Sequence, residues 1–140
     1  MHKPVKILSK LYDVPDGHTL RVYEQANGYQ AAKKALFMPQ AAVIDEMKKA
    51  NVRGRGGAGF PAGIKWGFMK PDPQRPAYLV VNADEGEPGT FKDRTLMEKD
   101  PHRCIEGCII ASYAIGAHAC YIYVRDELHL SKARLWGAIR

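Results

Sequence analysis

The sequence has no long hydrophobic run and no leader-like segment. No stretch of its 140 residues approaches the roughly 20 consecutive apolar residues that cross a bilayer. Residues 1–12 alternate basic and apolar side chains without a continuous apolar segment, which argues against a secretory signal. Hydrophobic residues make up 46% and charged residues 26% of the chain, a balance that argues against disorder. These features predict one soluble globular domain without a membrane span of its own.

Cysteine is scarce. Cys104, Cys108 and Cys120 form an odd set without a Cys-x-x-Cys pair, which argues against a disulfide framework and fits a reducing compartment. Cys104 and Cys108 would share one helix face, but a pair at that spacing lacks the further ligands of a zinc or iron–sulfur site. Because cysteine packs as a small hydrophobe, we expect buried structural thiols rather than metal ligands.

Acidic residues are outnumbered. The formal net charge is +6, which indicates an anionic partner. Nucleic acid, a phosphate-bearing cofactor and an acidic protein surface all meet that description. Since the basic residues are scattered along the chain, a generally solvated basic surface is an equally good interpretation.

Periodicity predicts an α/β order after a turn-rich stretch that ends near Gly28. A strand, helix and strand in series form a βαβ unit with parallel strands, and ligands of such sheets gather at the carboxyl ends of the strands. The acidic loop, residues 82–87, follows the first strand. The expected elements are a helix at 29–37, a helix starting after Pro39, a fully buried strand at 78–81, a buried helix at 101–116, a strand at 119–124 and a helix at 128–140.

The glycine loop, residues 53–61, has four glycines within six residues and cannot sustain regular structure. Its letters match G-x-G-x-x-G, but a helix is expected before it rather than the strand of a dinucleotide fold. Backbone without side chains lets a planar or phosphate-bearing ligand approach closely. The alternatives are a flexible turn, and a single RGG-type RNA element built on Arg53 and Arg55.

The acidic loop crowds Asp84, Glu85 and Glu87 together in a basic chain, and these carboxylates would repel nucleic-acid phosphates. Carboxylates accept hydrogen bonds from ribose or ribityl hydroxyls. A cofactor with phosphate and polyol parts would use both loops together with Lys65. Taken alone, either loop also fits a solvated turn.

Two blocks, residues 53–66 and 82–94, resemble one family in sequence, order and separation. They are similar to the N-terminal part of the F subunit of NADH-quinone oxidoreductase, which is the FMN- and NADH-binding flavoprotein of respiratory complex I. The resemblance implies an α/β fold, namely the N-terminal part of a Rossmann-like FMN-binding domain with a short parallel sheet flanked by helices.

The resemblance also implies FMN and NAD(H) as cofactors and assigns residues to each. Hydride would pass directly between the two rings, so no side chain is expected to be catalytic, although Glu87 would lie nearby. The aromatic pair would stack on adenine. Matching positions around FMN are Gly54, Gly56, Lys65, Asn82, Asp84 and Glu85, with Gly86 contributing backbone, and those around NADH are Gly57, Phe60, Lys65, Phe68 and Glu87.

By the same resemblance, residues 1–140 form a single, incomplete FMN/NADH-binding domain. Its parts would be an N-terminal arm at about 1–38, the glycine loop at 53–61 and a βαβ unit at about 77–125. The family continues with a segment that completes the pocket and with four cysteines that hold a [4Fe–4S] cluster. The three cysteines here do not match those ligands, so we expect no cluster ligands in this chain.

The resulting hypothesis is an NADH dehydrogenase component that accepts hydride from NADH onto FMN and passes electrons to the iron–sulfur clusters of an NADH:quinone oxidoreductase. Expected partners are the other peripheral-arm subunits, especially the [2Fe–2S] subunit, with no nucleic acid and only indirect membrane contact. The expected location is cytoplasmic, on the inner face of the cell membrane, or on the matrix side in mitochondria. Alternatives are a non-catalytic fragment or interaction module, and the related diaphorase module of an NAD-linked hydrogenase or formate dehydrogenase.

Overall fold

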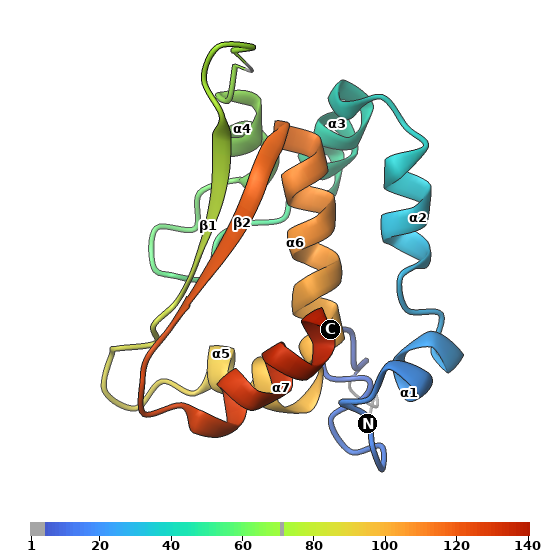
Figure 1. Cartoon of the computed structure of the whole chain (residues 1–140), viewed down its shortest axis with the longest axis vertical. Helices are drawn as coiled ribbons and strands as arrows, with labels where there is room; N and C mark the ends of the chain where they lie inside the picture. Colours follow the sequence, from blue (N-terminus) through green and yellow to red (C-terminus); the bar gives the residue numbers. More distant parts are fainter. Residues whose placement is uncertain (1–4, 71) are drawn as a thin grey trace. The chain divides into compact units, whose positions relative to one another are not determined.

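The computed structural model describes residues 5–70 and 72–140. In these ranges two strands alternate with helices along the chain (Figure 1). No helix in the described ranges is long and apolar enough to span a bilayer. The elements are α1 (Leu20–Gln25), α2 (Gln30–Leu36), α3 (Gln40–Ala50), α4 (Ala62–Gly67), β1 (Ala77–Ala83), α5 (Lys92–Lys99), α6 (Pro101–Ile115), β2 (Ala117–Val124) and α7 (His129–Ile139).

The α/β prediction is confirmed, since β1 and β2 form a two-stranded parallel sheet flanked by helices. The predicted helices at 29–37, 101–116 and 128–140 correspond to α2, α6 and α7. Three helices were not predicted. α1 and α4 have six residues each, too few for a periodic pattern, and α5 is dominated by charged side chains.

The prediction that the first strand is fully buried is wrong. Exposed and half-buried residues alternate along β1, and Tyr78 and Val80 are 51% and 67% exposed. Tyr121 on β2 is likewise 59% exposed, and its ring lies 6.0 Å from that of Tyr78. An apolar run therefore gave the strand but not its burial, because Val and Tyr are favoured in strands even where only one face is packed.

Two compact units make up the chain. Unit 1 contains the described residues up to Tyr29 together with Asn82–Glu106 and Ile122–Arg140. Unit 2 contains the described residues of Gln30–Val81 together with Gly107–Tyr121. The glycine loop therefore belongs to unit 2, and the acidic loop belongs to unit 1.

Unit 1 has a core beneath the acidic loop. Ala83 at the end of β1 packs with Met97 of α5 and Leu135 of α7, and all three are at most 6% exposed. Cys104 and Ile122 complete this cluster. Burial of this apolar surface fixes the point at which the chain leaves the strand and enters the acidic loop.

A buried polar cluster ties the N-terminal arm to the start of α6 within unit 1. The carboxylate of Glu106 accepts hydrogen bonds from the Tyr23 hydroxyl and from the Tyr29 backbone N–H, the latter at 3.1 Å. The Tyr29 hydroxyl lies 2.8 Å from Nδ1 of His102, and the His102 ring stacks on that of Tyr23. Burial, and next the hydrogen bond to Glu106, raise the pKa of Tyr23.

Unit 2 holds α4 tightly against α3. A Cβ added at Gly63 would lie 2.5 Å from the Lys48 nitrogen and 2.7 Å from the Met47 carbonyl carbon. No side chain fits there, so the two helices can approach only because position 63 is glycine. This contact anchors the segment that follows the glycine loop.

Candidate functional site

The glycine loop is a closed structure rather than a flexible connection. An antiparallel bridge joins Arg53 to Pro61, and the Gly54 N–H donates to the Phe60 carbonyl at 3.0 Å. The Arg53 guanidinium donates to the Gly59 carbonyl at 3.2 Å. The base of the loop is therefore fixed by hydrogen bonds that do not depend on glycine side-chain space.

The rim of the loop is bare backbone. A Cβ added at Gly56, Gly57 or Gly59 would meet nothing within 4 Å. Gly57 also has φ +124°, a conformation that residues with a side chain rarely adopt. A flat ligand can therefore lie directly on the peptide groups of the rim.

Two aromatic rings stand together next to this rim. Phe60 ends the loop and Phe68 follows α4, and their ring centroids are 6.0 Å apart with an interplanar angle of 48°. They are 46% and 66% exposed. Lys65 lies between them in sequence and its side chain is exposed. An exposed aromatic pair beside a cation suits a planar, anionic ligand.

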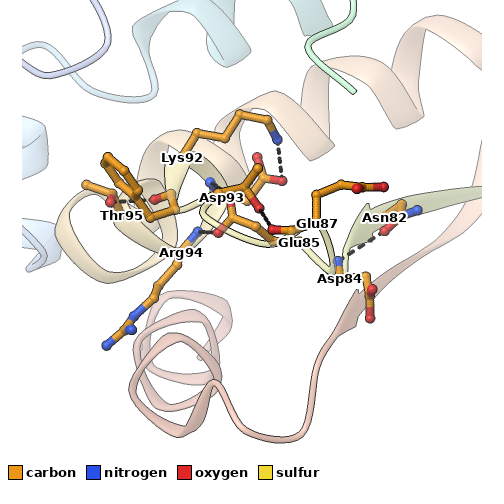
Figure 2. A network of polar contacts seen from close by, with 10 residues as sticks. Asn82, Asp84, Glu85, Glu87, Lys92, Asp93, Arg94 and Thr95 are labelled. Carbon is orange, nitrogen blue, oxygen red and sulfur yellow. Dashed lines mark hydrogen bonds and ion pairs between the residues drawn. The ribbon is translucent and has the colours of Figure 1, made fainter. Parts of the chain in front are cut away.

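The acidic loop begins at the carboxyl end of β1, as predicted, and Asn82 is still within the strand. The Asn82 side-chain oxygen accepts a hydrogen bond from the Asp84 N–H at 3.0 Å, which turns the chain out of the sheet (Figure 2). Asn82 and Glu87 are exposed, whereas Asp84 is half-buried. Polar oxygens are thus presented at the strand end, where they can accept hydrogen bonds from hydroxyl groups.

Glu85 has a role that the sequence interpretation missed. One of its carboxylate oxygens accepts from the Asp93 N–H at 2.7 Å and the other from the Arg94 N–H at 2.8 Å (Figure 2). These donors belong to the first turn of α5, which has no partner for them inside the helix. Glu85 therefore caps α5 from eight positions upstream, at φ +49°.

Glycine at position 86 makes room for a neighbouring carboxylate. A Cβ there would lie 2.7 Å from one carboxylate oxygen of Asp84. In Figure 2 the Glu87 side chain extends away from the Glu85 hydrogen bonds. The loop therefore separates its acidic residues, because Glu85 serves the helix while Glu87 remains exposed.

The cysteine prediction holds for one position and is wrong for another. Cys104 packs in the Ala83–Met97–Leu135 cluster, and burial, with a smaller effect of Asp100, raises its pKa to about 12. Cys120 instead lies exposed on β2, because a strand places successive side chains on opposite faces and only one face is packed. Within residues 5–70 and 72–140, no group of three His, Cys, Asp or Glu side chains could hold a metal ion.

Comparison with known proteins gives one consistent family. The Nuo51 FMN-binding domain family matches residues 47–140. The chain is 50% identical to an NADH-quinone oxidoreductase F subunit, the one numbered 2, of Rhizobium meliloti (strain 1021), over 99% of this chain and 33% of that protein. It is 52% identical to the corresponding F subunit of Aquifex aeolicus (strain VF5), over 88% of this chain and 29% of that protein. The chain thus spans about a third of the length of these relatives.

Solved structures resemble the whole described fold. A crystal structure of an NAD⁺-reducing [NiFe]-hydrogenase in the air-oxidized state superposes with a TM-score of 0.71 at 36% identity. The match covers 98% of this chain and 22% of that chain. The H₂-reduced state gives the same TM-score at 37% identity.

Proposed function

Because this chain belongs to the Nuo51 FMN-binding domain family, we propose that it supplies the FMN- and NADH-facing loops of an NADH-oxidising flavoprotein. The observation that carries the proposal is the bare rim of the glycine loop beside the exposed Phe60–Phe68 pair. That combination leaves space and stacking surface for planar rings, where an ordinary turn would carry side chains.

The residues of both loops fit FMN. The open positions at Gly54 and Gly56 allow the ring system to approach the backbone, since a Cβ there would project into the space that the ring needs. Lys65 is a cation for the phosphate. Asn82 and Asp84 offer oxygen acceptors for the ribityl hydroxyls, and Gly86 leaves its backbone accessible.

Glu85 would serve this site by positioning rather than by direct contact. Its two carboxylate oxygens are engaged by the backbone of Asp93 and Arg94. The carboxylate thereby fixes the chain on either side of Asp84 and Gly86 relative to α5. We assign it to holding the acidic loop in the shape that accepts the polyol.

NADH would be held by a second group of residues, Gly57, Phe60, Phe68 and Glu87, together with Lys65. The aromatic pair offers a face for the adenine ring. Gly57 leaves room for the nicotinamide, and Glu87 can accept hydrogen bonds from ribose or amide groups. FMN, when bound, supplies the ring that accepts hydride. The task of these side chains is to orient and enclose the reactants, and none is needed as a general base.

The family relationship supports a place in a larger enzyme. We propose that the 140 residues are one part of an FMN/NADH-binding domain, since the curated relatives are about three times as long. In that assembly electrons would pass to iron–sulfur clusters, with the [2Fe–2S] subunit as the nearest partner and the cytoplasmic or matrix face of the membrane as the location. This part would itself contribute no cluster ligands.

A second candidate is the diaphorase module of an NAD-linked hydrogenase. It is supported by the TM-score of 0.71 against the NAD⁺-reducing hydrogenase. The quinone-reducing assignment ranks first because sequence identity to the Rhizobium meliloti NADH-quinone oxidoreductase protein is 50%, against 36% to the hydrogenase. Both candidates use the same two cofactors and differ in the electron acceptor.

The test is a titration of the chain with FMN, followed by quenching of flavin fluorescence, and then addition of NADH to the complex without oxygen. We expect saturable binding of one FMN and bleaching of the flavin absorbance by NADH. Gly56→Val should weaken FMN binding at least about tenfold, because its side chain occupies the bare rim.

Gly107→Ala is the matched control, since a Cβ there also meets nothing within 4 Å but lies on α6 away from either loop. It should bind FMN like the parent chain. Absence of FMN binding in the folded parent chain would overturn the proposal and favour the non-catalytic alternative. Equal binding by the parent and Gly56→Val would show that the glycine loop is not the flavin site.

A further inference from the structure

Unit 1 contains a cavity that the proposed flavin site does not use. It has a volume of about 200 Å³ and lies between the N-terminal arm, the end of α5 and the start of α7. Its charged and titratable lining comes from Asp16, His18, Glu98, Lys99 and Arg134. None of these residues belongs to the glycine loop or the acidic loop.

Arg134 has an unmet hydrogen-bonding requirement in this cavity. Its Nε is buried and has no hydrogen-bond partner among the described residues. A buried donor without an acceptor costs free energy, and the cost is greater when the group is charged. The position therefore calls for an acceptor that can enter the cavity.

The nearest carboxylates do not meet this requirement. Glu98 accepts from Arg94 Nε at 2.9 Å and from the Ser131 hydroxyl at 3.4 Å. Asp16 lines the same cavity, but within the described part of the chain no ion pair joins it to Arg134. With Glu98 balanced by Arg94, the cations Arg134 and Lys99 outnumber the remaining acid in the lining.

We propose that this cavity binds a small oxyanion, a carboxylate or a phosphate, with the Arg134 guanidinium as its principal partner. The planar guanidinium matches two oxygens of such an anion through paired N–H groups. Lys99 adds a second cation from α5. The volume of about 200 Å³ admits a few heavy atoms and one or two waters rather than a nucleotide.

His18 provides a reporter inside the same cavity. Burial, and next the positive charge of Arg134, lower the pKa of His18, while Asp16 opposes them. Lys99 and Glu98 also face this space from α5. A bound anion would offset the charge of Arg134, so its binding should raise the pKa of His18. By linkage, the anion should bind more tightly as the pH falls and His18 takes up a proton.

The test is to titrate the chain with inorganic phosphate and, separately, with acetate, while sodium chloride keeps the ionic strength constant. NMR signals of the His18 ring report binding and its pKa. We expect saturable shifts of these signals with at least one of the two anions, and an upward shift of the His18 pKa at saturation. The stronger of the two responses identifies the headgroup that the cavity prefers.

Arg134→Gln should weaken the anion at least about tenfold, since one charge-assisted contact is lost. Arg125→Gln is the matched control: Arg125 pairs with Glu127 at 3.3 Å and does not line the cavity. It should change the affinity less than about twofold. Lys99→Gln, at an exposed residue, gives a second variant with an intermediate loss if Arg134→Gln fails to fold.

Three results would overturn the proposal. The first is that neither anion shifts the His18 signals beyond the chloride control. The second is that folded Arg134→Gln binds as the parent does. The third is that Arg125→Gln weakens the anion as much as Lys99→Gln does, which would indicate a general response to surface charge.

Discussion

The glycine loop and the acidic loop are held in place by different chemistry. Backbone hydrogen bonds and the bridge from Arg53 to Pro61 close the glycine loop. A side chain holds the acidic loop, since the carboxylate of Glu85 reaches the N-terminus of α5. The first loop keeps its rim bare and the second keeps a set of oxygens in order.

This difference determines what each loop can tolerate. In the glycine loop, shape depends on the backbone conformation and on the anchor behind it at Gly63. In the acidic loop, shape depends on two hydrogen bonds to one carboxylate. The comparison therefore predicts that glycine substitutions and acid substitutions affect stability in different places and by different amounts.

The largest expected effect is at the anchor of the glycine loop. Gly63→Val should lower the free energy of unfolding by about 3 kcal/mol or more, because its side chain would overlap the backbone of Met47 and Lys48. Gly67→Ala, in the same helix, is the control, since its Cβ would make ordinary contact at 3.7 Å. Urea unfolding measures both, and a Gly63→Val chain as stable as Gly67→Ala would contradict the close packing of α3 and α4.

The next effect concerns the side chain that holds the acidic loop. Glu85→Ala should cost about 1–2 kcal/mol, the range for loss of a helix cap, and should speed hydrogen exchange at the first amides of α5. Glu87→Ala is the control, because Glu87 is exposed and equally acidic. If both variants lose the same stability, the capping role of Glu85 is wrong.

Within the glycine loop itself, two positions should differ. Gly57→Ala should cost about 1 kcal/mol, because Gly57 has φ +124° and alanine is strained there. Gly56→Ala should cost less than about 0.5 kcal/mol, since its φ is not positive and an added Cβ meets nothing. Thermal unfolding distinguishes them, and a reversed order would mean that the rim has another backbone shape.

The smallest effect tests whether pH acts outside the loops. Burial lowers the pKa of His102, so the unfolded chain binds a proton more readily than the folded one. Stability should therefore be complete above the unfolded value near pH 6.5 and decline as the pH falls below it. Urea unfolding at pH 7 and pH 5.5 should show a smaller decline in His102→Gln than in the parent. His129→Gln, at an exposed residue, should decline as the parent does, and equal declines in all three chains would contradict the assignment.

Some features could be read from the sequence because local rules determine them. The glycine run predicted a loop with open backbone, and Phe60 and Phe68 were expected together and lie together. The βαβ order followed from apolar runs of strand and helix length. The cofactor contacts of the individual residues remain predictions.

Other features had no local signal. The cap from Glu85 to α5 spans eight positions, whereas the usual capping box spans three, so no pattern revealed it. The need for glycine at position 63 comes from α3, a separate element. The exposure of Tyr78 and Val80 depends on which face of the sheet is covered, which an apolar run does not specify.

The central claim is that the two loops, different as they are, serve one flavin. The most direct measurement is a titration of the ¹⁵N-labelled chain with FMN, followed by the backbone amide signals of residues 54–60 and 82–87. The account predicts that both sets shift and that they saturate at the same FMN concentration. Shifts confined to one loop, or none in either loop, would contradict it.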